Sequence, residues 1–220
     1  MSQGVVAAQL NRATDILKSL GLLRDRNYYP GYSSVKASEF RQLSYLEVWK
    51  KSYTERLYDF QLSDGSLLQF RSGVGKKTDH SYAYLDSPYQ YRPTFDEFLS
   101  QFDEEDIFRI QRDYDLLDSD VKQDVTPIRY DYAPDQYTIG RHPASHIHFG
   151  HGNQIRVATR NVLTPLAFLL LVIRQCYPNQ WVHLLMDKET NNLCRNVREV
   201  LVAVPDTHWG NYDDWELFLS

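Results

Sequence analysis

The chain is poor in cysteine and has no long hydrophobic run. Its 220 residues include only Cys176 and Cys194, which are too few for a disulfide framework and lack metal-motif spacing. We therefore expect reduced thiols in a cytoplasmic protein. The strongest apolar run, Leu166 to Ile173, is far shorter than the roughly 20 residues of a membrane-crossing helix. The N-terminus also lacks the charged and apolar regions of a signal peptide, so we predict no membrane association.

An excess of positive charge is missing as well. The 24 Lys and Arg residues are outnumbered by 29 Asp and Glu, which gives a net charge of −5. This argues against the broad basic face of a strongly electrostatic nucleic-acid binder. The glycine-rich stretch Gly73 to Lys77 lacks the spacing of a phosphate-binding loop, and no GxSxG motif marks a nucleophilic serine. No motif with an established mechanism is present.

The chain has the length and composition of one folded domain. Hydrophobic residues make up 42% and aromatic residues 14%, with 16 tyrosines. We predict a single domain over residues 1–220, with a family-like core at about 43–178. Whether the N-terminal helix is peripheral stays open at this point.

Periodicity and capping signals predict α+β elements. Helices are expected at 3–20, at 45–54 behind the capping box of Ser44 and Glu47, and in two acidic pieces over 94–117. Strands are expected at 57–62, 67–71, 80–85, 128–132, 146–150 and 154–158, with a loop at 27–34. Thr164 and Pro165 should begin a long buried helix near residues 165–177. The fold class is therefore α+β, a mostly antiparallel sheet packed on helices.

Polar side chains recur on one face of these strands. Because side chains alternate along a strand, a single face would carry Asp59, Gln61, Gln69, Arg71, Arg129, Asp131, His146 and His148. Such a face suits acid–base chemistry on a phosphate, with arginines holding the anion and a histidine transferring protons. A solvated sheet face would give the same alternation. The sequence favours the solvated interpretation slightly.

Four of the seven histidines lie between His142 and His151. His146 and His148 could ligate one metal, with His142 or Asp131 as a third ligand. The spacing matches no established zinc motif, so a metal is possible but is not the favoured interpretation. We assign no metal ligand and no cofactor-binding residue.

Several segments resemble a bacterial family described only as domain of unknown function 2290. They are residues 43–45, 62–69, 80–84, 127–132, 142–146, 163–165 and the helix to Tyr177. The resemblance includes Arg129, Asp131, His142, Ser145 and His146 but not His148 or His151. It implies that a metal site built on His146 and His148 would not be shared by the whole family.

Two hypotheses follow. The first is a cytoplasmic phosphodiesterase or nuclease-like hydrolase that takes a phosphate-containing substrate. Its candidate catalytic residues are His146, Asp131, Arg129, Arg71, His142 and Ser145. The alternative is a non-enzymatic interaction module that binds a protein partner through its tyrosines and the aromatic-acidic tail 209–220.

Overall fold

A computed structural model of the chain describes residues 2–31, 40, 42–72, 79–89, 110, 121–122, 124–152 and 155–214. Its centre is a seven-stranded antiparallel sheet whose strands follow one another in chain order. These strands are β1 (Leu23–Arg26), β2 (Phe60–Leu62), β3 (Leu67–Ser72), β4 (His80–Leu85), β5 (Ile128–Tyr132), β6 (Ser145–Phe149) and β7 (Val157–Ala158). The sheet and its helices confirm the α+β class.

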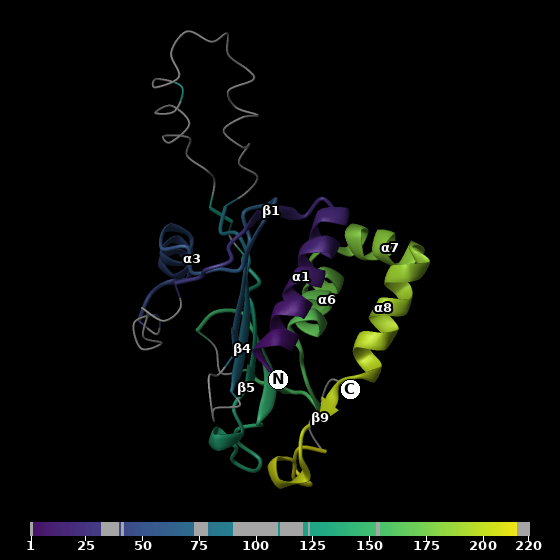
Figure 1. The fold of residues 1–220 in the computed structure, drawn as a ribbon. Helices are drawn as coiled ribbons and strands as arrows, with labels where there is room; N and C mark the ends of the chain where they lie inside the picture. Colours follow the sequence, from purple (N-terminus) through teal and green to yellow (C-terminus); the bar gives the residue numbers. More distant parts are fainter. Residues whose placement is uncertain are drawn as a thin grey trace.

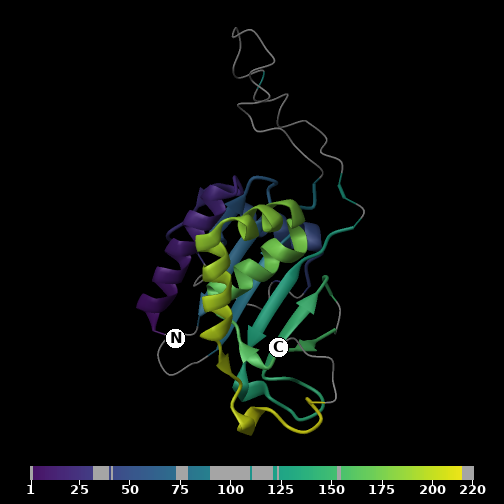
Figure 2. The ribbon, with the colours of Figure 1, turned by 90° about the vertical axis from the view of Figure 1, so that its right-hand side faces the viewer.

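Helices cover both faces of the sheet. On one face lie α1 (Gln3–Ser19) and α6 (Pro165–Cys176), and α3 (Tyr45–Thr54) lies on the other (Figure 1). Two further helices, α7 (Pro178–Met186) and α8 (Lys188–Glu199), continue from α6. Figure 2 shows α8 leading down to a small sheet of β8 (Asn161–Val162) and β9 (Val202–Ala203). Within the described residues, no helix has the length and apolar character needed to cross a bilayer.

The predicted helix caps and the predicted turn are present in the structure. Ser44 and Glu47 form the capping box that begins α3, with the Glu47 carboxylate 2.7 Å from the Ser44 nitrogen. The Thr164 hydroxyl caps α6 by accepting from the Ala167 nitrogen, and Pro165 follows at the first helical position. Gly65 makes the turn between β2 and β3 at a φ of 87°, a conformation that glycine adopts without strain.

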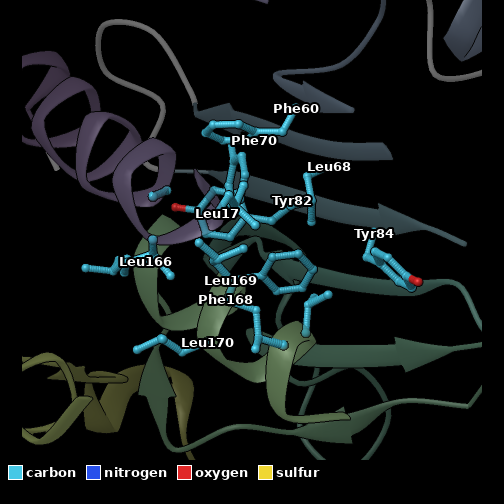
Figure 3. Packing of buried hydrophobic residues seen from close by; sticks show 14 of the residues in the cluster. Leu17, Phe60, Leu68, Phe70, Tyr82, Tyr84, Leu166, Phe168, Leu169 and Leu170 are labelled. Carbon is cyan, nitrogen blue, oxygen red and sulfur yellow. The ribbon is translucent and has the colours of Figure 1, made fainter. Parts of the chain in front are cut away.

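The main core lies between the sheet and the helices α1 and α6. Phe168, Tyr82 and Leu17 are fully buried and meet there (Figure 3). The Phe168 ring packs edge-on against Phe70, with ring centroids 6.0 Å apart. Leu10 and Leu17 belong to this core, so the N-terminal helix is not peripheral. The predicted burial of the helix that begins after Thr164 is confirmed.

Several predictions changed or fall outside the described residues. The predicted strand at 154–158 shortens to Val157–Ala158, and β1, β8 and β9 were not predicted. Residues 27–31 form neither helix nor strand, as predicted. The predicted acidic helices at 94–117 lie outside the described residues apart from Ile110, as do residues 32–34 of the predicted loop.

The described part of the C-terminal tail is only partly exposed, since Tyr212 is 56% exposed while Trp209 and Asp213 are buried. Trp209 packs with Ala144, Ala158 and Val204 in a small core of its own. Asp213 is also buried and accepts a hydrogen bond of 2.8 Å from the Tyr137 hydroxyl. Residues 209–214 are therefore part of the folded structure, and residues 215–220 lie outside the described part.

Candidate functional site

The strand register gathers polar side chains on the sheet face opposite α1 and α6. Asp131 on β5 pairs directly with His146 on β6, and Arg129 pairs with His148. On the other side of β5, Ser81 of β4 is the partner of Asp131. Because these residues alternate with core residues such as Tyr130, all of their side chains share one face. The register thus places the predicted polar residues of β5 and β6 on one face of the sheet.

Several polar side chains on this face are buried and not exposed to solvent. The exposed fractions of His146 and His148 are 1% and 6%, and Gln69 is also buried. Ordinary solvated sheet faces do not bury titratable side chains, because removing them from water is costly. The solvated-face interpretation is therefore wrong for these residues.

Asp131 is the centre of the cluster. One carboxylate oxygen, Oδ1, accepts from the Ser81 hydroxyl at 2.8 Å, and Oδ2 accepts from Arg129 Nε at 2.8 Å. His148 Nε2 lies 3.5 Å from Oδ2, and His146 Nε2 lies 4.0 Å from it. Burial by itself would raise the pKa of Asp131, but His148, the Arg129 charge and Ser81 together lower the pKa to about 2. Asp131 is therefore a carboxylate at neutral pH.

His146 is held in one tautomer. Its Nδ1 lies 2.8 Å from the main-chain oxygen of Pro143, which can only accept a hydrogen bond. Nδ1 therefore carries the ring proton, and in the neutral ring Nε2 presents a lone pair toward Asp131. Burial, followed by the neighbouring His148, lowers the pKa of His146 to about 4. At neutral pH the ring is uncharged.

His142 lies at the edge of the cluster. A turn places it there, since its main-chain nitrogen donates to the Thr138 oxygen at 2.8 Å. Its ring meets the His146 ring edge-on, with centroids 4.9 Å apart. Burial, the Arg156 charge and His148 lower the pKa of His142. Its Nδ1 is buried and has no hydrogen-bond partner among the described residues.

Two of the predicted residues do not join the cluster. Arg71 lies on the same face but two strands from Asp131, with Ser81 between them in the register. Ser145 points to the opposite face, because it is the neighbour of His146 in the same strand. Its hydroxyl contacts the Tyr130 hydroxyl at 2.9 Å and the Thr159 hydroxyl at 2.6 Å, so it links β6 to the core.

Sequence reasoning missed two residues and considered a third only as a possible metal ligand. Ser81 holds Asp131, and Arg156 acts electrostatically on His142. His148 was placed on the polar face, yet it was not among the candidate catalytic residues. The alternation of residues 80–85 contained the signal for Ser81, since it puts Ser81 on the face opposite Tyr82.

A separate hollow lies at the other end of the strands. Its volume is about 450 Å³, and Tyr84, Asp86, Lys122 and Cys176 are among its lining residues. Burial raises the pKa of Cys176 to about 11, so this thiol is not an activated nucleophile. None of its lining residues belongs to the Asp131 cluster.

Comparison with known proteins gives a family without a described activity. Residues 25–206 match the model of DUF2290, described as an uncharacterized conserved protein. The match covers most of the chain, so this protein belongs to the DUF2290 family, and the predicted resemblance is confirmed. No curated protein and no solved structure matches the chain.

Proposed function

We propose that the protein is a phosphodiester hydrolase whose active site is the cluster of Asp131, His146 and His148, with Arg129 at its rim. One observation carries the proposal. An ionised carboxylate and two buried imidazoles converge within 4.8 Å on a sheet face, beside an arginine whose side chain is 52% exposed. Buried titratable groups with perturbed pKa values are typical of functional sites.

Arg129 is the group that would bind the phosphate. Its Nε is occupied by Asp131, while its two terminal nitrogens make no hydrogen bond to any described residue. A guanidinium held in this way presents two parallel donors to an anion. Arg71, on the same face, adds positive charge farther along the sheet.

Asp131 and His146 would activate the attacking water. The Asp131 carboxylate and the unprotonated Nε2 of His146 face the same point, from which both can accept a proton. A positioned base of this kind contributes roughly 10²–10⁴-fold to a rate. The net charge of −5 favours a short or small phosphodiester over a long duplex.

The test is hydrolysis of bis(p-nitrophenyl) phosphate and of short single-stranded DNA and RNA. Asp131→Asn should lower kcat by roughly 10²-fold or more, because the amide keeps the shape but cannot act as a base. Arg129→Gln should raise KM with a smaller effect on kcat. The matched control is Arg195→Gln, an exposed arginine of α8. A wild-type protein inactive on all these substrates, or a fully active Asp131→Asn variant, refutes the proposal.

The proposed setting is the bacterial cytoplasm. Cys176 and Cys194 are both free thiols, which suits a reducing compartment. The bacterial origin rests on the resemblance alone.

The alternative function is a non-enzymatic interaction module. The tail supports it less than expected, since Trp209 and Asp213 are buried and Tyr212 is the exposed aromatic residue of its described part. Further support is the exposure of Tyr28 and Tyr29 and that of Val182, Met186 and Val200 on and beside the C-terminal helices. The hydrolysis assay separates the two functions, because an interaction module has no activity that Asp131→Asn could remove.

A further inference from the structure

We propose that Asp131, His146 and His148 bind one divalent transition-metal ion, with zinc as the reference metal and at least one coordination position left open. The inference deepens the proposed function: with the ion bound, Asp131 and His146 would activate the water through the metal instead of accepting its proton directly. The catalytic meaning of the ion rests on that function. The binding site itself stands on the geometry of the three side chains.

The donor atoms are already close to the spacing that a metal needs. One donor atom from each of the three residues lies within 4.8 Å of the others. His148 Nε2 and His146 Nε2 are 3.5 and 4.0 Å from Asp131 Oδ2. Around a tetrahedral zinc at 2.0–2.1 Å, neighbouring donors are roughly 3.3 Å apart. Small rotations of the three side chains would bring their donor atoms to this spacing.

The cluster brings two acceptors face to face. Pro143 fixes the ring proton of His146 on Nδ1, so the Nε2 lone pair points toward the Asp131 carboxylate 4.0 Å away. A buried lone pair opposite an anionic oxygen is unfavourable unless something positive lies between them. A cation at this point is a ligand for both groups and removes the repulsion.

Outer contacts orient two of the ligands as they do in metal proteins. His146 donates its other ring nitrogen to a main-chain oxygen, a contact that fixes the ring and directs Nε2 inward. The Asp131 carboxylate is held by Ser81 and Arg129, one donor on each oxygen. An Oδ2 that accepts from Arg129 keeps a second lone pair for a metal.

The charges around the cluster set the expected stoichiometry and coordination. Among the described residues, Arg129 bonds to Asp131 and the Arg156 charge acts on His142, while Asp131 is the carboxylate of the cluster. One divalent ion is therefore the most that the site would hold. Two imidazoles and one carboxylate select zinc, iron(II) or similar ions over magnesium and calcium. With three protein ligands, a fourth position stays available for water, as in catalytic zinc sites. His142 is near enough to approach that position.

The experiment measures zinc binding by the full chain without an affinity tag. The protein is treated with chelator, dialysed, and titrated with zinc sulfate by calorimetry, and magnesium chloride is titrated as the comparison metal. We expect the protein to bind one equivalent of zinc, with an affinity at least 100-fold higher than its affinity for magnesium.

His148→Gln and Asp131→Asn should each weaken zinc binding at least tenfold. His151→Gln and His183→Gln change exposed histidines outside the cluster and should leave it unchanged. Circular dichroism establishes that each variant is folded. If His148→Gln does not fold, Asp131→Asn still tests the metal site, because it is an isosteric change at a partly exposed side chain.

The zinc titration tests the metal site, and the hydrolysis assay tests the proposed hydrolase. No stoichiometric zinc, or zinc binding unaffected by Asp131→Asn and His148→Gln, overturns the metal site. Zinc binding that depends on both residues, in a protein that hydrolyses no phosphodiester, supports the metal site and refutes the hydrolase. Hydrolysis that persists in metal-free protein and requires Asp131 supports the hydrolase and refutes a catalytic role for the ion, while the zinc titration alone decides whether the metal site exists.

Discussion

His146 Nδ1 lies 2.8 Å from the main-chain oxygen of Pro143, three residues earlier in the chain. This contact ties the turn before β6 to the cluster and decides which ring nitrogen faces Asp131. The two nitrogens of His146 thus have separate tasks. Nδ1 holds the turn, while Nε2 is directed toward the carboxylate.

The two tasks can be separated by substitution. Asn at position 146 places an amide nitrogen near the position of Nδ1 but has no group at Nε2. We expect His146→Asn to retain most of the thermal stability lost in His146→Ala, because the Pro143 contact remains. Its zinc affinity should nevertheless fall at least tenfold, within the 10–100-fold range that weaker changes around metal sites produce. Melting temperature and calorimetry on both variants check this, and wild-type zinc affinity in His146→Asn would contradict it.

Ser145 should matter for stability and not for the site. Its hydroxyl contacts Tyr130, Thr159 and the main-chain oxygen of Asn161 in the buried interior. Ser145→Ala leaves buried polar groups with fewer partners, so we expect a loss of about 1–3 kcal/mol in urea denaturation. Zinc affinity and hydrolysis per folded molecule should match the wild type. A stable variant without activity would instead return Ser145 to the catalytic residues.

Phe168 tests the position of α6 in the core. The side chain is fully buried and contacts the rings of Phe70 and Tyr82. Phe168→Ala should destabilise the protein by about 3–5 kcal/mol, since it removes a large side chain and leaves a cavity. Val182→Ala, at an exposed position of α7, is the control. Equal denaturation midpoints for the two variants would place α6 outside the core.

The capping box of α3 gives a local test. Ser44→Ala removes the hydroxyl that caps the helix, and the loss should be about 0.5–2 kcal/mol. Ser63→Ala, at an exposed turn position, should change stability by less than about 0.5 kcal/mol. Thermal denaturation of both variants measures the difference, and an equally small effect of both would show that the box is dispensable.

Elements with strong local signals could be predicted from the sequence. The caps at Ser44 and Thr164 and the alternation at 128–132 act within a few residues, so they are visible without tertiary structure. Strand β1 has no such signal, because Leu23–Arg26 is mostly charged and becomes a strand by pairing with β2. The two-residue strands β8 and β9 likewise depend on each other.

The site was predicted only in part, for a related reason. Alternation places Asp131, His146 and His148 on one face, but it does not say that this face is buried or that its nitrogens converge on one carboxylate. Those properties depend on the pairing of β5 with β6 and on the turn at Pro143. Ser145 became a candidate because it belongs to the segment that resembles the family, but adjacent strand residues point to opposite faces, so it lies away from the cluster.

The direct pairing of Asp131 with His146 restricts where this family can gain or lose residues. One residue inserted within β5 or β6 would turn every following side chain to the other face. The carboxylate or the imidazoles would then point beneath α6, and an aromatic or aliphatic side chain would take their place outside. Insertions and deletions among relatives that keep the cluster should therefore fall in residues 134–141, after β5 and before the turn that holds His146.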